Sequence, residues 1–212
     1  MELHEIVVLA AFASLVIELV VFPIPSEAST YQLFLRDAPR SSDEDRLSRA
    51  RERRNLAKFL RYFLPTATGV VLFLTPLALV FQPQLRDWLW PVRPLETTAV
   101  LTAGMSAIVF GRTITMLATL QLRRAQRGDS GLAARGLFKH SRNPGLVGMY
   151  SFYLGLALVF PCWVLFVGFF PYVFNMHRRV LMEESHLGHT LGGGYAAYLR
   201  AVPRYLPLGP LR

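Results

Sequence analysis

Residues 142–176 read RNPGLVGMYSFYLGLALVFPCWVLFVGFFPYVFNM, a basic turn followed by two apolar runs at about 145–160 and 162–176. Pro161 divides the two runs, and proline favours a turn because it cannot continue a helix without losing a backbone hydrogen bond. Each run is shorter than the roughly 20 residues that cross a hydrocarbon core. The stretch therefore predicts a helical hairpin whose tight turn lies near the far side of a membrane.

Three further apolar runs precede this hairpin, at about 5–22, 64–81 and 97–117, in a chain of 212 residues that is 52% hydrophobic. Cys162 is the single cysteine, so no intramolecular disulfide holds the fold. We predict an all-α, polytopic membrane protein with about five transmembrane helices. It forms one integral membrane domain, 1–212, in which 1–120 holds three transmembrane helices and a basic loop at 23–63.

The lysines and arginines predict the orientation of this protein in the membrane. Of 23 in total, nine lie in 23–63, six in 118–144 and five in 177–212, whereas 82–96 has only two. Positive residues mark the cytoplasmic side, which places the N-terminus outside and the C-terminus inside. Contact with anionic membrane lipids then explains the net charge of +9, and no nucleic-acid role is predicted.

Within 23–63 we expect an amphipathic helix capped by Ser42, or else a solvated charged helix.

Two ionisable residues fall inside the apolar runs, where a charge is costly unless it is paired. Glu18 lies about thirteen residues, and Arg112 about fifteen, from the outer ends of their spans. At roughly 1.5 Å per residue these depths agree within a few ångströms. The sequence therefore predicts a Glu18–Arg112 ion pair, with unassisted snorkelling of Arg112 as the alternative.

The residues after the hairpin complete a set of motifs. Glu183 and Glu184 form an acidic pair, residues 191–198 read LGGGYAAY, and residues 202–207 read VPRYLP. In order and spacing, residues 136–207 resemble the isoprenylcysteine carboxyl methyltransferase family of membrane enzymes. The family pattern Arg-His-Pro-x-Tyr-x-Gly corresponds to residues 142–148, with Asn143 in place of histidine and Leu146 in place of tyrosine.

The resemblance implies S-adenosylmethionine-dependent methylation of a lipophilic or lipidated acceptor, with an isoprenylcysteine-type carboxylate first and a phospholipid, small amine or thiol as alternatives. It implies that the cofactor is bound by Arg142, Pro144, Gly148, Glu183, Glu184, Tyr195, Tyr198 and Arg204. The candidate catalytic residues are Arg142, Asn143 and His140. Asparagine does not titrate near neutral pH, so His140 is proposed as a base by proximity alone. We expect the glycines at 192–194 to break the last helix and turn the chain back.

Structural readings of the same residues stay open. Asn143 and Pro144 are typical of a helix start, Arg179 and Glu183 of a surface ion pair, and the tyrosines with Arg204 of an interfacial belt. His186 and His189 lack further ligands, so no metal site is predicted. Nothing resembles a Rossmann dinucleotide fingerprint. A nicotinamide-dependent reductase-like protein, or a non-catalytic membrane protein that keeps the fold, is the remaining alternative.

Overall fold

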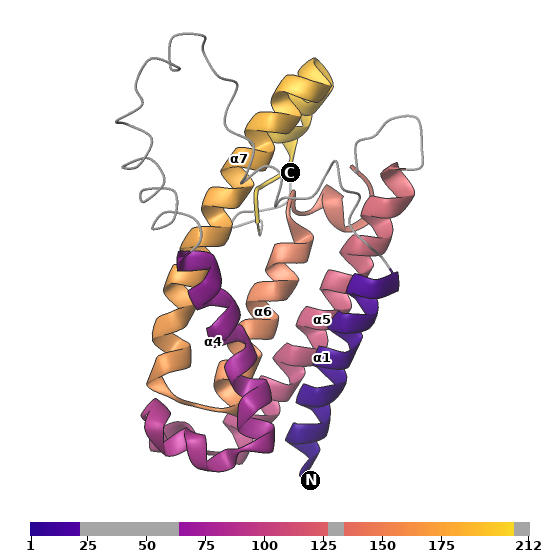
Figure 1. Cartoon of the computed structure of the whole chain (residues 1–212). Coiled ribbons are helices and arrows are strands. Elements are labelled where there is room, and N and C mark those ends of the chain that lie inside the picture. Colours follow the sequence, from indigo (N-terminus) through magenta and orange to yellow (C-terminus); the bar gives the residue numbers. More distant parts are fainter. Residues whose placement is uncertain (22–63, 127–133, 206–212) are drawn as a thin grey trace, which may run out of the picture.

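The computed structural model describes residues 1–21, 64–126 and 134–205. Within these residues the structure is helical and contains no strand, which confirms the all-α class (Figure 1). Every predicted apolar run coincides with an α-helix, although two of the helices extend well beyond their runs. The helices are α1 (Leu3–Val21), α4 (Leu64–Phe81), α5 (Thr98–Gln126), α6 (Pro144–Val159) and α7 (Trp163–Ala201).

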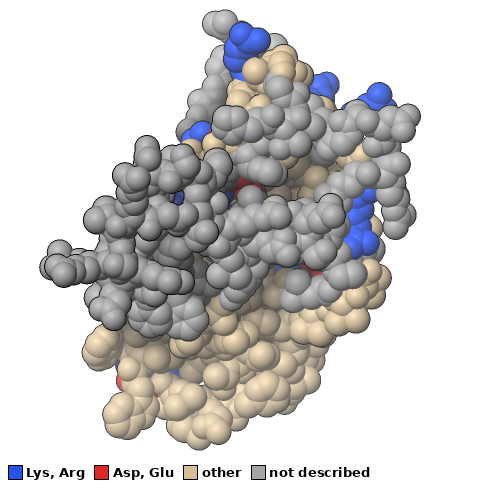
Figure 2. Space-filling view, turned by 45° about the horizontal axis from the view of Figure 1, so that its top comes forward, with Lys and Arg blue, Asp and Glu red and all other residues tan. Residues whose placement is uncertain are grey.

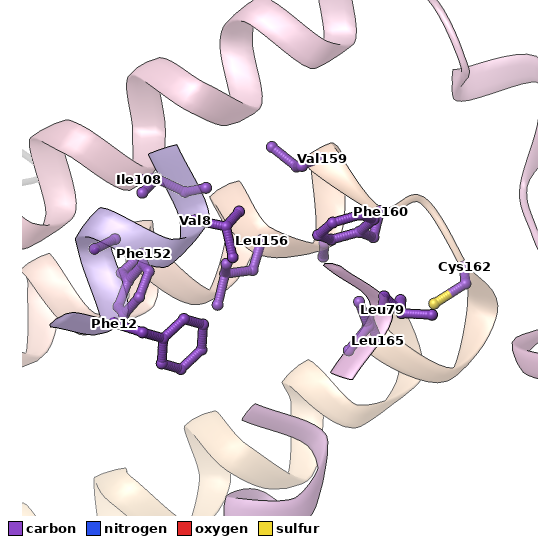
Figure 3. Close-up of a cluster of buried hydrophobic side chains, with 12 residues drawn as sticks. Val8, Phe12, Leu79, Ile108, Phe152, Leu156, Val159, Phe160, Cys162 and Leu165 are labelled. Carbon is purple, nitrogen blue, oxygen red and sulfur yellow. The ribbon is translucent and has the colours of Figure 1, made fainter. Parts of the chain in front are cut away.

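The helices lie side by side, with α6 between α5 and α7, α1 along α5 and α4 along α7 (Figure 1). Their shared core draws at least one fully buried side chain from each of them (Figure 3). Because all five helices contribute to one cluster, they form a single packed bundle. The labelled members of the cluster are Val8, Phe12, Leu79, Ile108, Phe152, Leu156, Val159, Phe160, Cys162 and Leu165.

Helices α5 and α6 approach each other through glycines. A Cβ atom on Gly148 would lie 2.6 Å from the Gly111 carbonyl oxygen, and one on Gly155 would lie 2.7 Å from the Gly104 carbonyl oxygen. The glycines are seven residues apart on both helices, so they recur on one face in an antiparallel register. Small residues allow such close approach in membrane helices, where packing replaces the hydrophobic effect. Between the two glycine contacts, Ser151 Oγ donates to the Ala107 carbonyl at 3.1 Å.

The turn between α6 and α7 confirms the predicted hairpin. The Pro161 carbonyl accepts a hydrogen bond from the Val92 amide at 2.8 Å, and the Trp163 amide donates to the Trp90 carbonyl at 2.9 Å. These partners belong to the connection between α4 and α5, which contains the short 3-10 helices η4 (Pro83–Leu89) and η5 (Arg93–Leu95). One end of the bundle is therefore closed by backbone pairing between two connections.

The opposite end of α5 leads into the 3-10 helix η6 (Gly136–Lys139). Gly136 has a φ of +61°, and a Cβ atom there would lie 2.5 Å from Gln121 Oε1. That oxygen accepts a hydrogen bond from the Leu137 amide at 2.8 Å. Glycine is required at this turn because it adopts positive φ without strain and leaves room for Gln121.

The predicted ion pair between α1 and α5 is present. Arg112 Nη2 lies 2.7 Å from Glu18 Oε2, and both residues are buried. Arg112 Nε also donates to Ser14 Oγ at 3.0 Å, and the Thr119 hydroxyl donates to Glu18. Arg112 therefore pairs inside the bundle and does not snorkel.

The outward faces of the helices are strongly apolar. Val20 on α1, Val71 on α4 and Phe170 on α7 are 72%, 65% and 73% exposed. Among the described residues, the stretch Thr98–Ala125 of α5 is long and apolar enough to cross a membrane by length and composition, and Gly69–Phe81 and Pro144–Val159 are shorter apolar helices. Exposed apolar surface on several helices at once is typical of a bundle surrounded by lipid.

One expectation about α7 is wrong. The helix continues through residues 192–194 and ends only at Ala201. Glycine weakens a helix by about 1 kcal/mol relative to alanine, but the buried ring of Tyr195 and the hydrogen bond from Tyr198 to the Phe138 carbonyl hold the following turns in place. The chain does come back, because Arg204 contacts Glu184 twenty positions earlier. The helix predicted within 23–63 lies outside the described residues.

Candidate functional site

An ionic cluster lies at the end of the bundle opposite the Pro161 turn. Arg142 precedes α6, Glu184 lies on α7, and Arg204 follows the end of α7. Arg142 Nη1 is 3.1 Å from Glu184 Oε1, while Arg204 Nη2 donates to Glu184 Oε2 at 2.8 Å and its Nε donates to Oε1 at 3.0 Å. A single carboxylate therefore joins three segments that are far apart in the sequence.

The charges of this cluster do not balance, because two guanidinium groups share one carboxylate. The side chains of Arg142 and Glu184 are only 11% and 12% exposed. Arg142 Nε is buried and has no hydrogen-bond partner among the described residues. The hydrogen bond to Glu184 raises the pKa of the Arg204 guanidinium further above its ordinary value. The cluster therefore has one surplus positive charge and one free donor, which suit an anionic group.

The residues after α7, 202–205, form a C-terminal strap across the start of α6. The Arg142 amide donates to the Pro203 carbonyl at 2.9 Å. The Arg204 carbonyl accepts from Asn143 Nδ2 at 3.2 Å and from Ser141 Oγ at 3.3 Å. The strap is thus held by the Arg142 amide and by the side chains of its two sequence neighbours, Ser141 and Asn143.

This arrangement gives Asn143 a structural task. Asn143 occupies the N-cap position of α6 and Pro144 the first helical position, as predicted for a helix start. However, the Asn143 side chain makes no capping hydrogen bond. Its amide group donates to the strap instead. The residue that replaces the histidine of the family pattern therefore holds Arg204 in place.

Tyr195 and Tyr198 line the cluster from the last turns of α7. Their ring centroids are 6.1 Å apart, and the Tyr198 hydroxyl donates to the Phe138 carbonyl at 2.8 Å. Burial raises the pKa of Tyr198 to about 12. Burial, and then the nearby Glu184 carboxylate, raise the pKa of Tyr195. Both phenols therefore stay neutral at physiological pH.

Not every predicted site residue belongs to the cluster. Gly148 is buried against α5, where a Cβ atom would lie 2.5 Å from Thr115 Oγ1. His140 is exposed at the end of η6, and Pro144 is buried at the start of α6. Glu183 forms the predicted i,i+4 pair with Arg179 at 3.4 Å. Geometry therefore singles out Arg142, Asn143, Glu184, Tyr195, Tyr198 and Arg204.

The structure adds residues that sequence reasoning left without a role. Ser141 supports the strap, and the Tyr205 hydroxyl forms a 2.9 Å hydrogen bond with His177 Nδ1. Tyr205 belongs to the VPRYLP motif, so its presence was visible, but its partner on α7 was not. Among the described residues, no group of three or more His, Cys, Asp or Glu side chains is placed to hold a metal ion.

Comparison with known proteins agrees with this geometry. Residues 99–193 match the family model of the phospholipid methyltransferases. No match was found among curated proteins or among solved structures. The matched region begins at α5, upstream of the resemblance at 136–207, and includes Arg142 and Glu184 but not the strap.

The class defined by this match is that of membrane-embedded methyltransferases that act on lipid-like substrates. The match of residues 99–193 to this family model confirms the resemblance to the superfamily of membrane methyltransferases that also contains the isoprenylcysteine carboxyl methyltransferases.

Proposed function

We propose that this protein transfers a methyl group from S-adenosylmethionine to a lipophilic acceptor at the cytoplasmic face of the membrane. The observation that carries the proposal is the bridge of Glu184 between Arg142 and Arg204. It lies at one end of a bundle whose outward faces are apolar. Family membership of the matched region supports a methyltransferase over a nicotinamide-dependent reductase.

The donor set of the cluster fits the cofactor. The free Nε donor of Arg142 and the surplus positive charge suit its carboxylate. The Glu184 carboxylate suits its ammonium group or ribose hydroxyls, with the Glu183 carboxylate, which pairs with Arg179, next to it in the sequence. The neutral rings of Tyr195 and Tyr198 suit its adenine. The bound cofactor supplies a methyl group already activated on a sulfonium.

The role of the protein is then to hold the cofactor and the acceptor and to orient them for methyl transfer. Orientation and exclusion of water account for much of the acceleration in transfers between two bound reactants. The strap fixes Arg204 through Asn143 and Ser141, so the position of the guanidinium depends on the fold and not on a free side chain. We assign Asn143 a positioning role. We assign the exposed ring of His140 no role in the methyl transfer.

The distribution of charge supports a multi-pass topology. In Figure 2 the lysines and arginines that the structure describes gather mainly toward the upper part of the molecule, while the lower part consists mostly of other residues. With the five helices as membrane spans, the basic end with the ionic cluster faces the cytoplasm. The soluble cofactor then enters from the cytosol, while the acceptor keeps its apolar chain in the bilayer.

Two acceptor classes follow from two observations. The matched family favours a phospholipid, and the motifs at 142–148 and 202–207 favour an isoprenylcysteine-type carboxylate. Both are lipophilic molecules with a polar group near the membrane surface.

The proposal is tested by incubating the purified protein in liposomes with S-adenosylmethionine that carries a labelled methyl group. One set of liposomes contains phosphatidylethanolamine and another contains an S-prenylated cysteine with a free carboxylate. Label in the lipid extract of either set, absent with the Glu184→Gln variant, supports the proposal. A folded wild type that neither binds S-adenosylhomocysteine nor labels either lipid contradicts it.

A further inference from the structure

All three tryptophans of the chain lie at the end of the bundle opposite the ionic cluster (Figure 1). Trp88 and Trp90 belong to the connection between α4 and α5, and Trp163 is the first residue of α7. Their exposed fractions are 82%, 69% and 57%. The Trp163 amide donates to the Trp90 carbonyl at 2.9 Å, so the backbone holds the three residues in one region. We call this region the tryptophan end.

Trp90 has a strained backbone conformation. Its φ of 53° and ψ of 78° lie in the left-handed region, and it is the one non-glycine residue with positive φ among the described residues. Glycine adopts this conformation without strain, whereas a bulky side chain does so rarely. The Trp90 side chain does not contribute to the buried core of the bundle. Strain at such a position indicates a use for the exposed ring.

Hydrogen bonds and an ion pair hold the tryptophan end in a fixed shape. The Val92 amide donates to the Pro161 carbonyl at 2.8 Å, and Arg86 Nη2 lies 3.1 Å from Glu96 Oε1. The connection 82–96 contains two basic and two acidic residues, so it has no net charge. The surface therefore presents indole rings and balanced charges, in contrast to the basic end of the bundle.

The length of α7 separates the tryptophan end from the ionic cluster by one membrane thickness. Trp163 and Glu184 are 21 positions apart on this helix, which corresponds to about 31 Å at roughly 1.5 Å per residue. The hydrocarbon core of a bilayer is about 30 Å thick. Residues 163–176 contain no charged side chain. When α7 crosses a bilayer, the ionic cluster therefore lies at one membrane surface and the tryptophans lie at the other.

We propose that the tryptophan end binds the interfacial layer of the bilayer, with the indoles of Trp88, Trp90 and Trp163 at the level of the lipid glycerol and headgroups. Tryptophan gathers at membrane–water interfaces because its ring is apolar while its N–H group can donate a hydrogen bond. The partner is a zwitterionic phospholipid surface, since a connection without net charge gains little from anionic lipids. This membrane contact does not depend on the reaction proposed for the ionic cluster.

The intrinsic fluorescence of the wild type tests the proposal, because every tryptophan belongs to this end. The protein is reconstituted into phosphatidylcholine liposomes whose acyl chains carry bromine either next to the glycerol or next to the terminal methyl group. A third sample, without bromine, contains iodide on both sides of the membrane. We expect bromine next to the glycerol to remove most of the emission. Bromine next to the methyl group removes less, and iodide quenches far less than it quenches free N-acetyltryptophanamide.

Three other results would overturn the proposal. Quenching by iodide to the level of the free compound, with little effect of either brominated lipid, places the rings in water. Strongest quenching by bromine next to the methyl group places them in the bilayer core. Emission that none of the three agents quenches shows that protein covers the rings, as in a dimer formed through this end.

Double variants that retain a single tryptophan assign the signal to each ring. Trp90→Phe with Trp163→Phe reports on Trp88, and the two corresponding variants report on the other rings. Helical circular dichroism equal to that of the wild type confirms that each variant is folded. The same order of quenching is expected for all three. If one of the reporters follows iodide alone, its ring lies outside the interfacial layer, and the proposal fails for the three rings as one surface.

Discussion

Arg112 and Glu18, 94 positions apart in the sequence, form a buried ion pair of 2.7 Å between α5 and α1. The guanidinium also lies over the ring of Phe152 on α6, 5.8 Å from its centroid. The pair thus links α1 to α5, where the match to the phospholipid methyltransferase family model begins. Inside an apolar bundle, this ion pair stabilises the packing of α1 against α5.

Glu18→Gln is expected to destabilise the protein strongly. The variant leaves the buried Arg112 charge without its counter-ion, and breaking a buried pair from one side costs about 3–5 kcal/mol. Denaturation in mixed micelles measures the loss, with Glu96→Gln as the control. Glu96 pairs with Arg86 in a more exposed site, where an ion pair contributes about 0–1 kcal/mol. If Glu18→Gln is as stable as the control variant, the ion pair does not stabilise the packing of α1 against α5.

The double variant Glu18→Leu, Arg112→Leu completes this experiment. Removal of both charges leaves no uncompensated group, so the double variant is expected to be more stable than Glu18→Gln. If it is less stable, the Ser14 and Thr119 bonds to the pair matter more than the charges themselves.

Gly148→Ala is expected to loosen the contact between α5 and α6. Its Cβ atom would lie 2.5 Å from Thr115 Oγ1 and 2.6 Å from the Gly111 carbonyl oxygen, and overpacking of this kind costs about 1–3 kcal/mol. Gly145→Ala on the same helix is the matched control, because its Cβ atom would meet only Ala118 Cβ at 3.8 Å. We expect the control to be neutral or slightly stabilising. Equal stabilities of the two variants in chemical denaturation would rule out close packing at Gly148.

Tyr198 is expected to make stability fall at alkaline pH. Its pKa is raised from 10.0 to about 12 in the folded protein, so the unfolded chain loses the proton first. The stabilising contribution is therefore complete below pH 10 and is lost as the pH rises through about 12. Tyr198→Phe removes this part of the pH dependence and, at neutral pH, costs about 1 kcal/mol because the Phe138 carbonyl loses its donor.

The measurement is the free energy of unfolding between pH 8 and pH 11 for wild type and Tyr198→Phe. The wild type should show the steeper decline above pH 10. Parallel curves for the two proteins would mean that the Tyr198 phenol titrates alike in both states.

The ion pair and the ionic cluster differ in how far sequence could predict them. Equal depth along two apolar runs was enough to pair Glu18 with Arg112, because helix rise is a fixed quantity. Arg142, Glu184 and Arg204 were each named from motifs, but their mutual contact depends on where the strap lies after α7. That is a long-range contact, which local pattern does not determine.

The glycines show the limits of local rules most clearly. The run at 192–194 predicted a helix end, but tertiary contacts of Tyr195 and Tyr198 keep the helix intact. Gly148 was assigned to the cofactor site through a motif, whereas the structure packs it on Gly111. The seven-residue spacing of glycines on both helices was visible in the sequence, but its meaning required the antiparallel register of α5 and α6.

The most direct test of the central claim is calorimetric titration of S-adenosylhomocysteine into the detergent-purified protein, with Glu184→Gln, Glu183→Gln and Glu96→Gln beside the wild type. We predict micromolar binding by the wild type and by Glu96→Gln, and affinity about 10–100-fold weaker for Glu184→Gln, since it loses charge-assisted hydrogen bonds at the site. Glu183→Gln should show a smaller loss, because Glu183 pairs with Arg179. No binding by a folded wild type, or equal affinity of Glu184→Gln, would contradict the assignment of the ionic cluster as the cofactor site.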